Sequence, residues 1–131
     1  MDLIDHNNQA QIDWRPGVST RMRISALTGA SALSIFEQWC VPGLGAPTHW
    51  HPVEEVLTVL SGQAEIWIEG EQVKASAGHS AVIPARRRHG FRNIGDGELH
   101  MFAVLASPVF EAHFDDNEGA IRRWIPDAGG I

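Results

Sequence analysis

Residues 43–62 read GLGAPTHWHPVEEVLTVLSG, a stretch with two histidines and two glutamates between glycines. His49 and His51 are two residues apart, so on an extended strand both side chains point to one face, roughly 7 Å apart. Glu55 follows four residues after His51 and shares that parity in a regular strand, although Pro52 interrupts the regularity. Two imidazoles and a carboxylate commonly hold iron, manganese or zinc and leave coordination positions open. The stretch therefore predicts a metal site.

The same residues follow the spacing G-x5-H-x-H-x3-E-x6-G, beginning at Gly43 and ending at Gly62. A chance match to five such positions is expected at well below about one in a million start sites, given residue frequencies. A second spacing, G-x5-P-x-G-x2-H-x3-N, is met downstream except that Arg86 replaces its central glycine; the matching residues are Gly78, Pro84, His89 and Asn93. Residues 43–62 and 78–93 resemble the first and second motifs of the cupin superfamily, in the form of its compact single-domain members.

This resemblance implies an all-β, double-stranded β-helix (a jelly-roll barrel) made by a single domain over residues 1–131. It also implies one divalent metal ion per chain, either iron, manganese, zinc or nickel, with four ligands: His49, His51, Glu55 and His89. Physical chemistry agrees, because burying three imidazoles and a carboxylate is costly unless they coordinate an ion or pair with one another.

Glycines and prolines are spread along the chain and separate short segments with alternating or β-branched residues, which also favours an all-β fold. The expected strands are Thr20–Leu27, Ala32–Val41, Glu54–Leu60, Gln63–Ile68, Glu71–Ala75, Ser80–Ile83, Gly90–Asn93 and Leu99–Leu105. Residues 1–15 are expected to form an arm or an edge strand. Residues 108–131 are expected to form an arm or a tail, with a short helix near Glu118–Trp124.

Glycine-containing pairs mark the expected turns, because glycine tolerates positive φ. Ser61-Gly62, Glu69-Gly70 and Asp96-Gly97 each predict a hairpin turn. The segment between Pro42 and Pro47 is rich in glycine and predicts a loop between two strands.

The hairpin expected at Asp96-Gly97 decides which side chains share the face of His89. A two-residue turn places His100 and Phe102 on that face and points both into the barrel, whereas a three-residue loop would reverse the parity. His100 is then either a catalytic general base or a histidine bonded to a neighbouring residue. Phe102 is a candidate substrate contact.

Two further substrate contacts are expected on neighbouring strands. Phe91 shares the face of His89, and Gln38 lies on the strand expected at 32–41. Side chains alternate between the two faces of a strand, so either Gln38 or Glu37 points inward, and the pattern does not choose between them.

Charge and composition restrict the partners. The 131 residues carry a formal net charge of −6 at pH 7, which disfavours nucleic acid as a partner. Cys40 is the single cysteine, so no internal disulfide is expected, and no signal peptide or membrane span is apparent. We expect a cytoplasmic homodimer that has no membrane partner and binds a small molecule. The basic run Arg86-Arg87-Arg88 is either an anion-capture site or a solvated turn or subunit contact.

The expected function is a metal-dependent enzyme in which Glu55 is both a ligand and a catalytic proton carrier. Iron suits a dioxygenase-like oxidoreductase, the reaction we favour, whereas manganese, zinc or nickel suits a lyase or isomerase. A module that only binds a sugar or carboxylate is the remaining alternative, because one fold can carry many functions.

Overall fold

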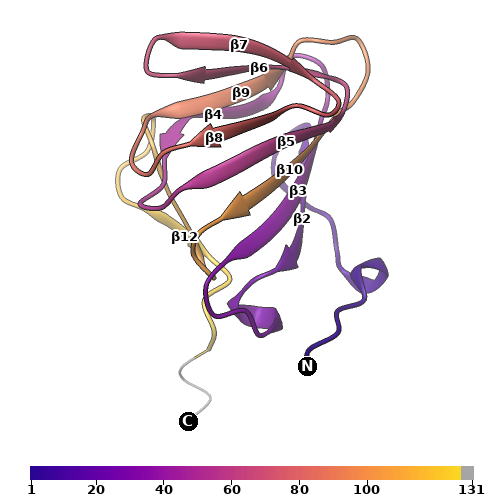
Figure 1. Ribbon diagram of the computed structural model, residues 1–131, viewed down its shortest axis with the longest axis vertical. Coiled ribbons are helices and arrows are strands. Elements are labelled where there is room, and N and C mark those ends of the chain that lie inside the picture. Colours follow the sequence, from indigo (N-terminus) through magenta and orange to yellow (C-terminus); the bar gives the residue numbers. More distant parts are fainter. Residues whose placement is uncertain (128–131) are drawn as a thin grey trace.

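Two antiparallel sheets of six strands each form the computed structural model, which describes residues 1–127 (Figure 1). The first sheet has the order β1-β2-β3-β10-β5-β8, and its strands are β1 (Ile12–Arg15), β2 (Val18–Ile24), β3 (Ser34–Cys40), β10 (Leu99–Leu105), β5 (Glu55–Ser61) and β8 (Ser80–Ile83). The second has the order β12-β11-β4-β9-β6-β7, and its strands are β12 (Ile121–Arg123), β11 (Phe110–Phe114), β4 (Gly45–Trp50), β9 (His89–Asn93), β6 (Gln63–Ile68) and β7 (Glu71–Ser76). The expected all-β jelly roll is confirmed.

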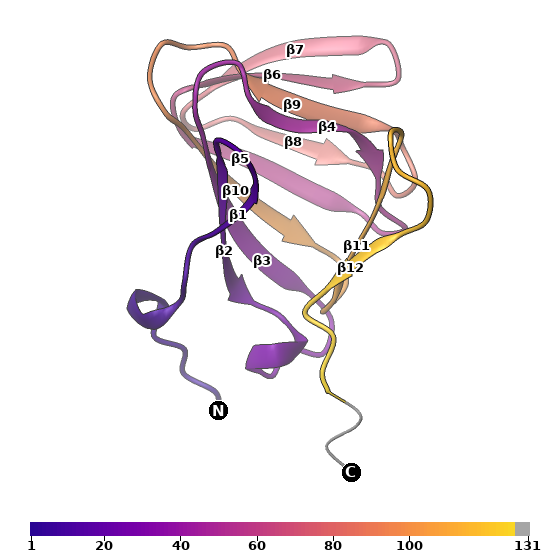
Figure 2. The same ribbon diagram turned by 180° about the vertical axis from the view of Figure 1, so that it is seen from behind.

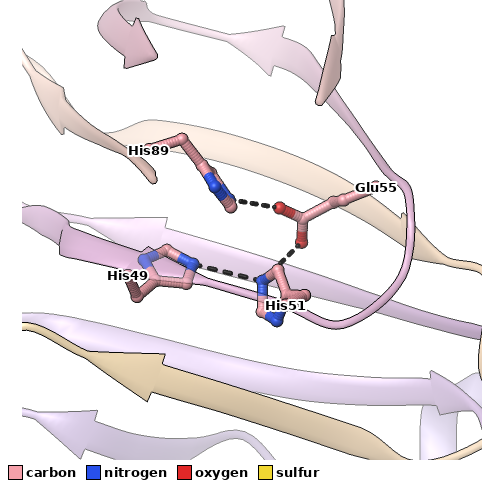
Figure 3. A group of neighbouring side chains, drawn as sticks. All are labelled: His49, His51, Glu55 and His89. Atoms are coloured by element: carbon pink, nitrogen blue, oxygen red, sulfur yellow. Dashed lines mark hydrogen bonds and ion pairs between the residues drawn. The ribbon is translucent and has the colours of Figure 1, made fainter. Parts of the chain in front are cut away.

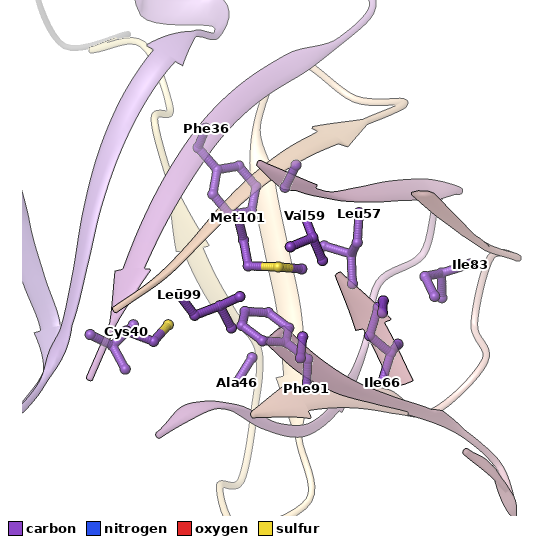
Figure 4. Packing of buried hydrophobic residues seen from close by; sticks show 14 of the residues in the cluster. Phe36, Cys40, Ala46, Leu57, Val59, Ile66, Ile83, Phe91, Leu99 and Met101 are labelled. Carbon is purple, nitrogen blue, oxygen red and sulfur yellow. The ribbon is translucent and has the colours of Figure 1, made fainter. Parts of the chain in front are cut away.

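Alternation along the strands places the core between the two sheets. In β10, Leu99, Met101, Ala103 and Leu105 are buried, whereas the residues between them are only partly covered. Figure 4 shows Met101 beside Leu57 and Val59 of β5, a strand of the first sheet, and beside Phe91 of β9, a strand of the second sheet. Burial of large apolar side chains stabilises such a core by about 1.5–3 kcal/mol for each.

Several predicted elements are confirmed. The strands expected at Gln63–Ile68, Ser80–Ile83 and Leu99–Leu105 have those bounds in the structure. Ile68 pairs with Glu71, so Glu69-Gly70 is a two-residue hairpin turn. Both turn residues have positive φ, 39° at Glu69 and 94° at Gly70, as a primed turn requires.

Two expected hairpins are wrong, because the chain crosses between sheets at both places. Ser61-Gly62 lies between β5 and β6, and Asp96-Gly97 lies between β9 and β10, but in each case the flanking strands belong to opposite sheets. At the first crossing, Gly62 has φ +88° and approaches the backbone so closely that a Cβ there would lie 2.7 Å from the Glu98 carbonyl oxygen. Gly62 therefore allows the bend by which the chain passes from one sheet to the other, and its presence does not indicate a hairpin.

The loop expected between Pro42 and Pro47 is also wrong in its second half, because β4 begins at Gly45. A Cβ on Gly45 would lie 2.1 Å from the carbonyl oxygen of Phe91 in the adjacent strand. The absence of a side chain therefore lets β4 and β9 approach one another. The glycine content predicted a loop, but Gly45 instead allows the backbones of β4 and β9 to pack closely.

The chain ends hold more strand than expected. β1 is the edge strand that was one of the two expectations for residues 1–15, whereas β11 and β12 were missed. The short helix predicted near Glu118–Trp124 is wrong, since Ile121–Arg123 is a strand paired with β11. The described part of the chain contains only two short 3-10 helices, η1 (His6–Asn8) and η2 (Ala26–Thr28), and no helix long and apolar enough to cross a membrane. The last four residues of the expected tail, 128–131, lie outside the described residues.

Side chains from both ends of the chain meet at the open side of the jelly roll. Figure 2 shows β1 and the β11–β12 pair on either side of it. The Trp14 ring of β1 lies 4.9 Å from the ring of Phe110 and 5.9 Å from that of Trp124, between ring centroids. Phe36 of β3 joins this aromatic cluster. The two ends therefore complete the wall around the interior.

Candidate metal centre

The four predicted metal ligands come together in one buried cluster (Figure 3). His49 lies on β4, His51 directly follows that strand, Glu55 begins β5 and His89 begins β9. One potential ligand atom from each residue lies within 4.8 Å of all the others, and each of the four residues is at most 5% exposed. The convergence expected from the sequence is confirmed.

Strand pairing explains how the cluster forms. His49 and His89 are opposite one another in the β4–β9 pair, where side chains on the same face are close neighbours. The segment from His51 to Glu54, which contains Pro52, then takes the chain from one sheet to the other, so Glu55 enters from the opposite layer. The backbone N–H of Arg86 donates to the His51 carbonyl at 2.8 Å and fixes this crossing.

Backbone carbonyls orient all three imidazoles. The Nδ1 atoms of His49, His51 and His89 lie 2.7, 2.8 and 2.9 Å from the carbonyl oxygens of Pro47, Glu111 and Arg87, respectively. A carbonyl can only accept a hydrogen bond, so each Nδ1 carries the proton when the ring is neutral. Each Nε2 lone pair is then directed into the cluster, and contacts of this kind orient histidines in metal sites.

The Nε2 atoms are closer than neutral rings allow without a cation between them. Nε2 of His49 lies 3.1 Å from Nε2 of His51, and Nε2 of His89 lies 2.9 Å from Oε1 of Glu55. With the Nδ1 protons occupied by carbonyls, these are contacts between acceptors, so protons or a metal ion must lie between them. The three nitrogens and one carboxylate therefore fit a divalent transition metal.

Burial and charge set the protonation of the cluster. Burial, together with the nearby His51 and His89, lowers the pKa of His49 to about 3. Burial opposes charge on His51 as well, but the Glu55 carboxylate raises the pKa of His51 above its ordinary value. Burial also favours neutral Glu55, yet the charge and hydrogen bond of His51 and the bond from His89 hold the pKa of Glu55 far below its usual range. The carboxylate is thus ionised and available as a ligand.

A narrow pocket adjoins the centre. The space between its wall atoms, open solvent at the mouth included, is about 410 Å³, and about 20 Å³ of it can hold the centre of a water-sized molecule. Its polar wall includes His49, His51, Glu55, Gln38 and Arg15. Its apolar wall is largely aromatic, with Trp14, Phe36, Phe91, Phe110 and Phe114, beside Ala46, Leu57, Met101 and Ala103. Pockets of this kind, apolar with a few convergent polar groups, are typical of small-molecule sites.

Two of the three predicted substrate contacts lie on this pocket. Phe91 is on its wall, as is Gln38, whose amide nitrogen donates to the Thr20 hydroxyl at 3.0 Å. The choice between Gln38 and Glu37 is therefore resolved in favour of Gln38. Glu37 lies on the other face of β3, where it is covered by neighbouring side chains and only 1% exposed.

The predicted inward direction of His100 and Phe102 is wrong. β10 does not pair with β9, so the register expected across Asp96-Gly97 does not exist, and both side chains lie on the outer face of the first sheet. His100 donates from Nε2 to Oε2 of Glu37 at 2.6 Å and stacks on Trp39. His100 is therefore a histidine bonded to a neighbouring residue, which was the alternative expectation. Neither His100 nor Phe102 lines the pocket.

Sequence reasoning missed the pocket residues contributed by the chain ends. Trp14 and Arg15 come from β1, and Phe110 and Phe114 come from β11. The segment 110–114 reads FEAHF, an alternation of apolar and polar residues that signals a half-buried strand. Residues 12–15 read IDWR and show the same alternation, over four residues only.

The basic run Arg86-Arg87-Arg88 and Cys40 lie outside the metal cluster. Arg87 pairs with Glu69 and Arg88 with Asp115, both at the surface, which favours the solvated-turn interpretation of the basic run. Cys40 is fully buried, and burial raises the pKa of its thiol to about 12, so the group stays protonated and is a poor nucleophile.

Comparison with known proteins agrees with the fold. The family model described as "Cupin domain" matches residues 40–105. The chain is 33% identical over 106 residues to "Polyketide synthase CurC" of Streptomyces cyaneus, covering 78% of this chain and 66% of CurC. Among solved structures, KdgF from Halomonas sp. superposes with a TM-score of 0.67 at 21% identity, over 79% of this chain and 90% of KdgF.

A mutant of Bacillus subtilis oxalate decarboxylase superposes with a TM-score of 0.76 at 20% identity, over 84% of this chain but only 31% of the decarboxylase. The chain thus spans just under two thirds of CurC and about a third of the decarboxylase. A jelly roll with three histidines and a glutamate at its interior defines a class of metal-site barrels. The chain belongs to the cupin family.

Proposed function

We propose that this cupin is a metal-dependent enzyme that holds one divalent ion on His49, His51, Glu55 and His89 and acts on a small molecule in the adjoining pocket. The observation that carries the proposal is the 3.1 Å contact between Nε2 of His49 and Nε2 of His51. Both rings direct their Nδ1 protons at carbonyls, so the contact calls for a cation in the cluster. When bound, such an ion supplies Lewis-acid or one-electron chemistry.

The chain's own residues have separate tasks in this proposal. The carbonyl partners keep the imidazoles oriented, and Glu55 supplies negative charge and accepts a proton. Trp14, Phe36 and the other aromatic rings exclude water and offer flat apolar faces to the substrate. A conjugated or aromatic substrate suits such walls, and the name of the relative CurC, a polyketide synthase, is compatible with one.

For the reaction we favour a dioxygenase-like oxidation with iron. Within residues 1–127, the ionisable side chains on the pocket wall are Arg15 and three of the metal ligands, His49, His51 and Glu55, so no separate general base faces the substrate. Oxidation by dioxygen depends less on such a base than elimination or isomerisation does. The non-redox alternative, a lyase or isomerase with manganese, zinc or nickel, requires Glu55 to move the proton itself.

Metal analysis of the untagged protein tests the proposal. The protein is purified without chelators under low oxygen, and its metal content is measured by elemental mass spectrometry. We expect about one metal ion per chain. Iron would direct assays to oxygen uptake with conjugated substrates, whereas manganese, zinc or nickel would support the non-redox alternative. A folded protein that contains no metal and takes up none would overturn the proposal.

A further inference from the structure

Arg15 is the one pocket cation that is not part of the metal cluster, within the described part of the chain. It ends β1 and lies on the same pocket wall as Gln38. One of its terminal nitrogens donates to the Gly45 carbonyl oxygen at 3.1 Å, which ties β1 to β4. A guanidinium has five N–H donors, so this contact leaves most of its hydrogen-bonding capacity for another group.

A second arginine reinforces the positive charge. Arg123 on β12 places its guanidinium carbon 4.2 Å from the ring centroid of Trp14, the residue that precedes Arg15. Its Nε is buried and has no hydrogen-bond partner. Burial lowers the pKa of both arginines, and the charge of Arg15 lowers that of Arg123 further. Two half-buried cations thus lie near one another.

Their charges are not neutralised by ion pairs within residues 1–127. The arginines that do form ion pairs with a carboxylate there are Arg23, Arg87, Arg88, Arg92 and Arg122. Asp116 attracts Arg15 electrostatically but is not within ion-pair distance. A partly buried guanidinium without a counter-ion is unfavourable, and an anionic ligand would relieve that cost.

We propose that the substrate is a conjugated or aromatic carboxylate whose anionic end is bound by Arg15, with support from Arg123, while its other end faces the metal centre. This inference rests on the proposed function, because it names the substrate class of the same pocket. The planar guanidinium fork matches a carboxylate, and the aromatic wall matches the part between the two polar ends. Arg15 is accordingly the specificity-determining residue of the pocket.

The alternative is that Arg15 only ties β1 to β4 through the Gly45 carbonyl. A matched pair of ligands separates the two, because a purely structural arginine does not distinguish a carboxylate from its neutral amide. The probes are trans-cinnamate and trans-cinnamamide, which have the same shape and differ in charge. Binding is measured by calorimetry on the metal-free protein, so that the ion cannot itself attract the anion.

We expect cinnamate to bind at least about tenfold more tightly than cinnamamide, a typical effect of one charge-assisted contact. Arg15→Gln should abolish this preference, Arg15→Lys should keep part of it, and Arg123→Gln should reduce it by roughly threefold. Arg122→Gln is the control, since Arg122 lies on the same strand but is exposed and pairs with Glu111. This control should leave both affinities unchanged.

Equal affinity for the two ligands, failure of both to bind, or an undiminished preference in Arg15→Gln would overturn the inference. Metal uptake measured on the same preparations keeps this result separate from the proposed function. Arg15→Gln should still take up about one ion per chain. A wild-type protein with normal metal content that does not prefer cinnamate contradicts only the substrate class. If the protein prefers cinnamate but takes up no metal, only the proposed metal-dependent enzyme function is contradicted.

Discussion

At the scale of single residues, the centre depends on contacts that lie outside the ligand set. Each imidazole is oriented by a carbonyl from a different segment of the chain, and one of them, that of Glu111, is 60 residues away from His51. Spacing in the sequence predicted the four ligands, because His49, His51, Glu55 and His89 follow a known pattern. It could not predict the carbonyl partners, since backbone atoms carry no mark in the sequence.

Glu55→Gln should separate catalysis from folding. The amide keeps the size of the side chain but removes the ionised oxygen that supports the charge on His51. We expect turnover to fall by at least about 100-fold, the upper part of the range seen when a metal site is perturbed. The melting temperature of the metal-free protein should change little. Turnover and thermal unfolding measured side by side check this, and a large loss of stability in the metal-loaded form alone would indicate a structural ion.

Arg86 occupies the position at which the second motif has glycine, and its φ of +68° is in the left-handed region. A β-branched residue is strained there, so Arg86→Val should lower the free energy of unfolding by about 1–2 kcal/mol. Arg86→Gly should be neutral or slightly stabilising, because relief of strain offsets the extra freedom of the unfolded chain. Urea unfolding measures both, and equal effects of the two substitutions would contradict this account.

At the scale of elements, the sequence predicted most strands but not which strands pair. Turn signals such as Glu69-Gly70 are local, and that hairpin is correct. At Asp96-Gly97 the same kind of signal marks a crossing between layers, and the resulting error turned His100 and Phe102 the wrong way. Whether two neighbouring strands pair depends on the whole topology of the jelly roll, which short-range patterns do not contain.

The outer face of the first sheet carries a polar cluster that joins three strands. Glu37 of β3 pairs with Arg23 of β2 and with His100 of β10. Burial disfavours the charged carboxylate, but the hydrogen bonds from Arg23 and His100 lower the pKa of Glu37 below its ordinary value. A lowered folded-state pKa means that the stabilisation is present above the ordinary carboxyl pKa of about 4.3 and is lost as the pH falls through the folded-state value.

Glu37→Gln should therefore destabilise the protein by about 1–3 kcal/mol at pH 7, and this difference from the wild type should shrink below about pH 4. Urea unfolding of both proteins at a series of pH values measures it. Glu65→Gln is a suitable control, because Glu65 makes an ion pair with an arginine that is half exposed. A pH-independent difference for Glu37→Gln would contradict the coupling.

At the scale of the whole molecule, the outer face of the first sheet is the surface on which we expect a second copy to bind. It presents Leu60 and Val82, which are 44% and 60% exposed, next to the partly covered Phe102 and Val104. Exposed apolar surface of this kind favours association. We expect a homodimer by analytical ultracentrifugation, and Val82→Lys should shift it toward monomer. A wild-type chain that stays monomeric at high concentration would contradict this.

The arrangement of ligands on both layers has a mechanical consequence. His49 and His89 belong to one sheet and Glu55 to the other. An ion that binds all three would therefore link two layers that otherwise hold together through apolar packing. Since the ion binds only the folded arrangement, its affinity adds directly to the cohesion of that end of the barrel, by about 2.7 kcal/mol when free metal exceeds its dissociation constant a hundredfold. The metal-free protein should therefore keep its folded pocket and lose only this added stability.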